Sequence, residues 1–174
     1  MNASWLETLI ERLEACGPVG QSTREYLRQR NVTLGVRPQP TGARWTMFSH
    51  IDLRPDFATG KDDAYALSLI VHEVQHLRQG WLTALSVYGE LKAWQMQFEF
   101  LKSLTGKYSA SSKNEEIITE LIALSITNRA DLKRARGLMQ AFAGKKYRID
   151  LLPSYPIGRE IWFWLTGKTE YLSA

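Results

Sequence analysis

The stretch SLIVHEVQHLRQG, residues 68–80, holds two of the three histidines of the chain. In an α-helix each residue advances by about 100°, so His72 and His76 lie on one face and Glu73 lies about 60° beyond His76. The opposite arc is apolar and consists of Ala66, Leu67, Ile70, Val71, Val74 and Leu77. The stretch therefore predicts a helix that packs with one face and presents two histidines and a carboxylate with the other.

The order His-Glu-x-x-His suits a metal site. His72 and His76 are one turn apart and can bind the same tetrahedral zinc ion. Glu73 would stand beside the metal, where a carboxylate can act as a general base on metal-bound water. The alternative interpretation is a pair of half-buried core histidines that flank a surface acid by chance.

A zinc site of this kind needs a third protein ligand and one open position for water. Glu90 is the first candidate, because it opens the next predicted helix in SVYGELKAW (residues 86–94). Ala93 follows on the same side of that helix, and a small residue there would allow a close approach to the histidine helix. Glu99 is a second candidate further along. The alternative for Glu90 is a first-turn glutamate that the helix dipole favours.

The rest of the pattern predicts an α+β fold that is mostly helical. The segments VTLGVRP (32–38) and ARWTMFSHIDLRP (43–55) alternate and are rich in β-branched and aromatic residues, with the turn-like QPTG between them. They predict a β-hairpin or small antiparallel sheet before the histidine helix. Helical periodicity covers the N-terminus to about Cys16 and the segment 115–143, which is broken near Asn128. We expect a single domain over residues 1–174.

Composition narrows the class of protein. With 174 residues, 44% of them apolar and 23% charged, the chain has an ordinary globular composition. The net charge of +4 does not indicate nucleic-acid binding. The lone Cys16 excludes an internal disulfide, and the N-terminus lacks the basic start of a signal peptide. No apolar run is as long as a membrane span. We expect a cytoplasmic protein without a membrane partner, and its oligomeric state is left open.

The motif HEVQH with the downstream GELKAW resembles the gluzincin branch of the zincin metallopeptidases, whose third ligand is a glutamate on the next helix. The resemblance implies that His72, His76 and Glu90 bind Zn²⁺ and that Glu73 is the general base and acid. Only thirteen residues, 77–89, separate His76 from Glu90, which is short for this group.

The resemblance covers roughly residues 32–101 and implies a zincin-like fold. In small members a compact sheet precedes the histidine helix, and the strand nearest the site binds substrate as an added strand. Here MFSHIDLRP (47–55) occupies that place in the sequence. A further donor often stabilises the transition state, and the candidates are His50, Tyr88 and Tyr155.

The function expected from the resemblance is zinc-dependent hydrolysis of a peptide or protein substrate. One alternative is a catalytically inactive or non-peptidase zincin-like domain that binds a protein partner. The other is a purely structural helical domain in which the motif is accidental.

Overall fold

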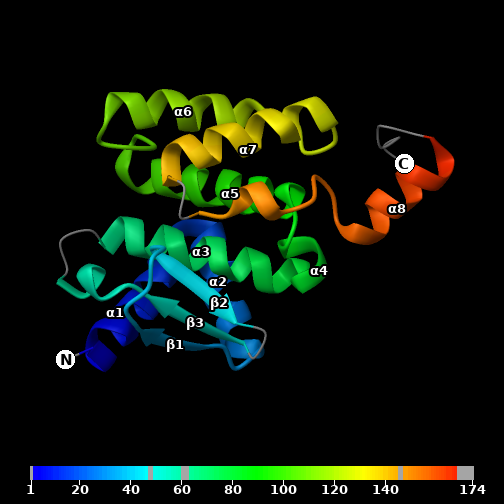
Figure 1. Ribbon diagram of the computed structural model, residues 1–174. Coiled ribbons are helices and arrows are strands. Elements are labelled where there is room, and N and C mark those ends of the chain that lie inside the picture. Colours follow the sequence, from blue (N-terminus) through cyan, green and yellow to red (C-terminus); the bar gives the residue numbers. More distant parts are fainter. Residues whose placement is uncertain (1, 47–48, 60–62, 145–146, 168–174) are drawn as a thin grey trace.

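The computed structural model describes residues 2–46, 49–59, 63–144 and 147–167, and this part of the chain is mostly helical (Figure 1). Its elements in chain order are α1 (Asn2–Ala15), α2 (Gly17–Gln29), β1 (Thr33–Val36), β2 (Ala43–Thr46), β3 (His50–Leu53), the 3-10 helix η1 (Pro55–Thr59), α3 (Asp63–Gln79), α4 (Trp81–Ala84), α5 (Val87–Thr105), α6 (Ser112–Ala123), α7 (Arg129–Ala143), the 3-10 helix η2 (Ile149–Leu151) and α8 (Ile157–Thr166). The α+β class predicted from the sequence is confirmed.

The three described strands form a mixed sheet, whereas the sequence predicted an antiparallel one. The strand order is β1-β3-β2, with β1 parallel and β2 antiparallel to β3. The segment 43–55 splits into two strands that pair with each other, and residues 47 and 48 between them lie outside the described chain. Ile51 and Leu53 of β3 are fully buried, which explains why this strand takes the centre, where both of its edges are paired.

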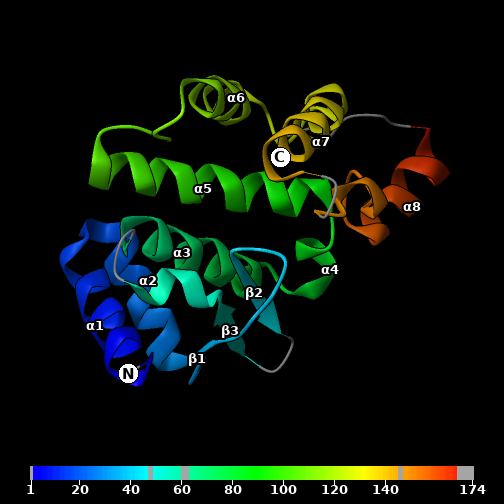
Figure 2. The same ribbon diagram turned by 60° about the vertical axis from the view of Figure 1, so that its left-hand side comes forward.

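The buried apolar side chains form two clusters, and the ribbon views show α1, α2 and the sheet on one side of the α3–α5 pair and α6 and α7 on the other (Figures 1 and 2). The lower cluster joins α1, α2, the sheet and one side of α3. The upper cluster joins α5, α6 and α7, and extends to Ile149, Tyr155 and Phe163. Helix α3 is buried continuously from Ala66 to His76, because the sheet and α1–α2 cover its apolar side and α5 covers its histidine side. The histidine face is therefore an internal face.

A tight connection brings α5 back across α3. Helix α3 ends at Gly80, whose positive φ of 73° favours glycine, and the four residues of α4 follow. The hydroxyl of Ser86 then caps α5 by accepting a hydrogen bond from the Gly89 amide at 3.0 Å. A Cβ at Gly89 would lie 2.1 Å from the carbonyl oxygen of Thr83. Glycine at position 89 thus permits the start of α5 to pack closely against α4. This close packing allows the thirteen residues 77–89 to bring Glu90 back to the histidines.

In the described residues, none of the helices combines the length and the apolar character that crossing a bilayer requires.

Candidate metal centre

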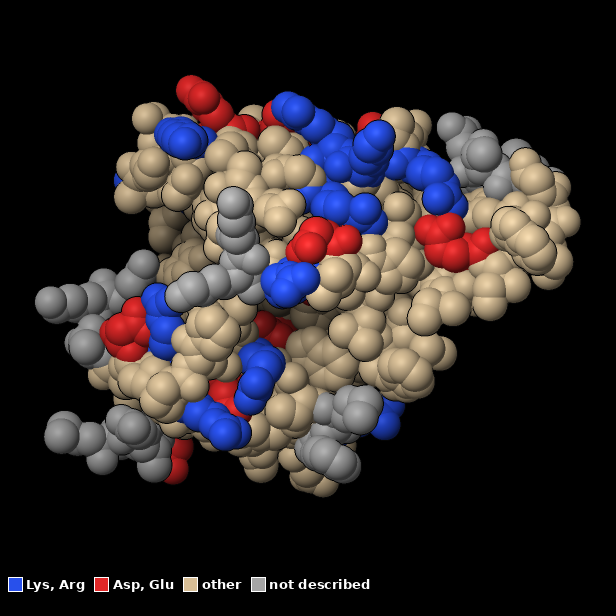
Figure 3. Space-filling model, viewed as in Figure 1, with Lys and Arg blue, Asp and Glu red and all other residues tan. Residues whose placement is uncertain are grey.

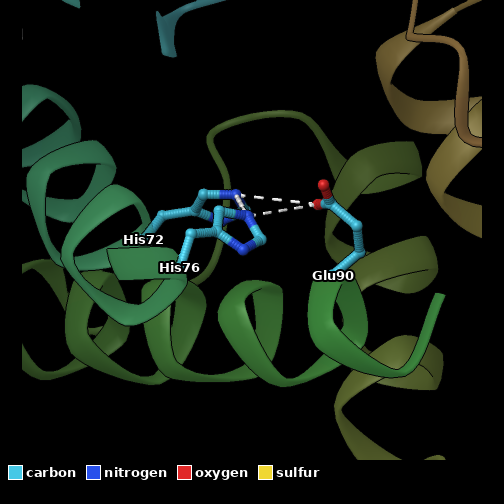
Figure 4. A group of neighbouring side chains, drawn as sticks. All are labelled: His72, His76 and Glu90. Carbon is cyan, nitrogen blue, oxygen red and sulfur yellow. Dashed lines mark hydrogen bonds and ion pairs between the residues drawn. The ribbon is translucent and has the colours of Figure 1, made fainter. Parts of the chain in front are cut away.

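The two histidines of α3 and Glu90 of α5 converge in the interior (Figure 4). The two Nε2 atoms are 2.9 Å apart, and the Oε2 atom of Glu90 lies 3.7 Å from that of His72 and 3.6 Å from that of His76. Ligand atoms about 2.0–2.2 Å from a tetrahedral zinc ion are about 3.3–3.6 Å from one another. The observed distances lie around this value, so the three side chains can hold a metal ion.

The backbone of the α3–α5 connection positions these ligands. The side chain of Gln79 donates a hydrogen bond to the carbonyl oxygen of Gly89 at 3.1 Å, and its own oxygen is 3.4 Å from Nδ1 of His76. Gln79 thus links His76 to Gly89, which is the residue immediately before Glu90. Fixing Nδ1 in this way leaves Nε2 of His76 directed at Glu90, which is the orientation that metal binding needs.

The charges of the centre favour an uncharged His72 beside an ionised Glu90. Burial, followed by the neighbouring His76, lowers the pKa of His72 to about 3. Burial acts to lower the pKa of His76 as well, but the Glu90 carboxylate outweighs it and raises that pKa. Burial acts to raise the pKa of Glu90, and the nearby His76 lowers it below its ordinary value. An ionised Glu90 and an uncharged His72 are the forms that bind a divalent cation.

Glu73 is buried beside the ligands and does not belong to their group. Its Oε2 atom accepts a hydrogen bond from the backbone amide of Trp45 at 3.0 Å, and burial raises its pKa to about 7. A carboxyl group whose pKa lies near neutrality can both take up and release a proton. This contact also shows which strand borders the site: it is β2, an edge of the described sheet, whereas the segment expected there, 47–55, contains the central strand β3 (His50–Leu53).

Tyr147, which follows α7, is a site residue that the sequence analysis missed. Its hydroxyl donates a hydrogen bond to Oε2 of Glu90 and accepts one from the indole of Trp94 at 2.9 Å. Burial and then the Glu90 charge raise the pKa of Tyr147 well above its ordinary value. The phenol therefore stays protonated and can serve as a hydrogen-bond donor. No local pattern connects Tyr147 to the histidine motif, because the chain between them forms α4, α5, α6 and α7.

The structure does not bring His50 to this centre. His50 alternates with Ile51 along β3, and Ile51 faces the core, so the imidazole lies on the opposite face of the sheet. There it contacts the Thr33 hydroxyl at 2.6 Å and the Asp52 carboxylate at 3.0 Å.

Tyr88 and Tyr155 are also placed elsewhere. Their rings pack together with centroids 6.1 Å apart, and the Tyr155 hydroxyl donates to the carbonyl oxygen of Thr127 at 2.7 Å. Tyr88 is two residues before Glu90, or about 200° around the helix, so it points away from the ligands. Glu99, the second candidate ligand, accepts a hydrogen bond from Tyr108 at 2.9 Å.

A cavity of about 210 Å³ borders the centre, and its wall includes His72, Glu73 and Tyr147. In the space-filling view this face of the molecule is hollowed near its middle, with acidic atoms at the bottom of the hollow and basic side chains around it (Figure 3). The centre is therefore accessible to a ligand from one side.

Comparison with known proteins gives no family for the chain: no protein-family model matches it, and no curated protein or solved structure has significant similarity to it.

Proposed function

We propose that the protein is a zinc-dependent peptidase. The observation that carries the proposal is the convergence of two imidazole nitrogens and one carboxylate oxygen, at 2.9, 3.6 and 3.7 Å from one another, beside the buried Glu73. Two histidines and a glutamate are a donor set of catalytic zinc sites that leave a position open for water. The likeness of the sequence to gluzincins supports the choice of peptide-bond hydrolysis.

A zinc ion bound here would supply a Lewis acid and would lower the pKa of its water towards about 7. Glu73 takes the proton from the attacking water and later delivers it to the leaving amine. The Trp45 amide holds one oxygen of Glu73 and leaves the other free for this transfer. Tyr147 donates its one hydroxyl proton in a hydrogen bond to Glu90 and so holds that ligand in place. His50, Tyr88 and Tyr155 lie away from the centre, so none of these three candidates is placed to donate a hydrogen bond to the oxyanion.

The backbone of β2 provides a place for an extended substrate. The strand runs from Ala43 to Thr46 at an edge of the described sheet, and the Trp45 amide on that edge already reaches Glu73. An added peptide strand along β2 would pass directly by the metal ligands. A peptide or protein is accordingly the substrate class that we propose.

Metal analysis and one substitution test the proposal. The protein, loaded with zinc and dialysed, should keep one zinc ion per chain, and it should hydrolyse members of a broad peptide library. Glu73→Gln should abolish hydrolysis and keep the zinc, because it removes the base and leaves the three ligands in place. Exposed Glu116 gives the control, since Glu116→Gln should change neither property.

Two results would decide against a peptidase. Protein without stoichiometric metal would exclude a zinc centre, and the motif would then be accidental. Protein that retains zinc but cleaves no peptide would instead favour the alternative of a zincin-like module that binds a partner.

A further inference from the structure

The cavity beside the centre lies between two parts of the molecule. One wall comes from residues 40–43, η1 and α3, and the other comes from α5 and the end of α7. Figure 2 shows α3 and the loop before β2 on one side of α5, and α7 on the other. Because the cavity borders both His72 and Glu73, a peptide that reacts at the centre would place a neighbouring side chain in it.

The wall of this cavity is aromatic and apolar away from the metal ligands. Its members there include Phe57, Tyr65, Leu69, Phe98 and Phe142. The one guanidinium in the wall belongs to Arg54, and Asp56 binds it with two hydrogen bonds of 2.6 and 2.7 Å. The positive charge of Arg54 is thus compensated, and the cavity suits an uncharged side chain.

A second cavity of about 420 Å³ neighbours the first and shares five wall residues with it: Arg54, Phe57, Tyr65, Phe98 and Phe142. The shared side chains, most of them aromatic, stand between the two cavities, so the first cavity is bounded by rings on that side. The size of a side chain that enters it is limited by these rings and by the loop 40–43.

Gly42 sets that limit. A Cβ at this position would lie 2.9 Å from Cδ1 of Leu69 and 3.6 Å from Cε2 of Phe57, which are both wall atoms of the cavity. The loop cannot retreat easily, because the Gly42 carbonyl accepts a hydrogen bond from the Arg54 amide at 3.0 Å. The Thr41 hydroxyl braces the same loop by donating to the carbonyl oxygen of Ala43 at 2.8 Å. Any side chain at residue 42 would therefore narrow the cavity.

We propose that this cavity is a specificity pocket for a large uncharged side chain, aromatic or leucine-like, next to the scissile bond, and that Gly42 keeps it wide enough for a ring. This proposal rests on the proposed peptidase function. It adds Gly42 as a residue that selects the substrate and takes no part in the hydrolysis itself.

The test begins with cleavage-site profiling. Zinc-loaded protein is incubated with a peptide library, and mass spectrometry records the residues on both sides of each cleaved bond. The expected result is enrichment of Phe, Tyr, Trp and Leu at one fixed position beside the bond, with Asp and Lys depleted there. Cleavage without such a preference would overturn the specificity pocket while leaving the peptidase function in place.

Gly42→Ala supplies the decisive comparison. It should shift the preference from aromatic to smaller side chains and lower the ratio of Phe to Ala cleavage by about tenfold. Gly137→Ala is the matched control, because a Cβ at Gly137 of α7 meets no atom within 4 Å, and its profile should equal that of the wild type. Leu69→Ala should act in the opposite direction and favour Trp. An unchanged profile in both Gly42→Ala and Leu69→Ala would refute the assignment.

A binding measurement separates the pocket from the chemistry. Glu73→Gln protein is titrated with two capped peptides that differ only by Phe or Asp at one central position. Tighter binding of the Phe peptide, lost on adding Gly42→Ala, supports the pocket even if the wild type cleaves nothing and the peptidase proposal fails. Equal binding of the two peptides would overturn it.

Discussion

Replacing Glu73 by glutamine should stabilise the metal-free protein at neutral and alkaline pH. Burial raises the pKa of Glu73 to about 7 from an ordinary value of 4.5, so the folded state resists the loss of this proton more than the unfolded state does. The contribution of Glu73 to the stability of the folded state is therefore fully present below about pH 4.5. That stabilisation is lost as the pH rises through about 7. Glutamine cannot ionise and keeps the acceptor oxygen that the Trp45 amide needs.

The size of the effect follows from the pKa values of Glu73. Each pKa unit corresponds to about 1.4 kcal/mol, so the full loss is about 3 kcal/mol. About 2.5 kcal/mol of it falls between pH 5 and pH 8, because unfolded Glu73 is already partly ionised at pH 5. The free energy of unfolding of Glu73→Gln, minus that of the wild type, should grow by this amount over the interval.

The assay is urea unfolding in the presence of a chelator, followed by tryptophan fluorescence at pH 5, 6, 7 and 8. Comparison of the two proteins at each pH cancels the groups that do not interact with Glu73, and the measured trend belongs to Glu73 together with the neighbouring His76 and Glu90. Glu116→Gln, at an exposed position, should show no such trend. A difference between Glu73→Gln and wild type that stays constant from pH 5 to pH 8 would refute the inference that Glu73 is desolvated in the folded state.

Three further predictions concern the ligands, the phenol that holds Glu90, and the sheet. Glu90→Ala should weaken zinc retention at least tenfold, whereas Glu99→Ala should not; equal retention in equilibrium dialysis would place the third ligand elsewhere. Tyr147→Phe should weaken zinc retention by about tenfold or more, because Glu90 loses the hydrogen bond from the phenol, and unchanged retention would show that the phenol does not hold this ligand. Gly35→Ala should destabilise the protein by about 1–3 kcal/mol in thermal unfolding, because its Cβ would lie 2.8–3.0 Å from side-chain atoms of the neighbouring strand. Gly137→Ala, with open space around it, should be neutral or slightly stabilising, and an equal loss in both would contradict the steric explanation.

The histidine helix and its carboxylate partner could be predicted because their geometry is local. His72 and His76 share a face through helical periodicity alone, and Glu90 stands at a capped helix start within the next segment. The structure brings these three residues together. The sequence pattern gives no reason to select Gly89. Its importance follows from the close packing of α5 against α4, which only the structure shows.

The remaining features of the fold and of the site depend on contacts between segments that are distant in the sequence. The strand order could not be read from the sequence, because an alternating pattern does not say which neighbour a strand pairs with. His50 was a candidate for the site on residue type, but its face of the strand follows from the register with β1 and β2. Tyr147 reaches Glu90 only after three helices have packed, so its role depends on tertiary structure.

The position of the metal centre between the two apolar clusters has a consequence for folding. His72 and His76 belong to the helix that the lower cluster holds, whereas Glu90 is followed by Leu91 and Trp94, which belong to the upper one. A metal ion bound by all three would act as a cross-link between the clusters. The loaded protein would then unfold as one cooperative unit. Separation of α3 and α5 would break the ligand set, so the bound ion would oppose that separation and stabilise the folded state.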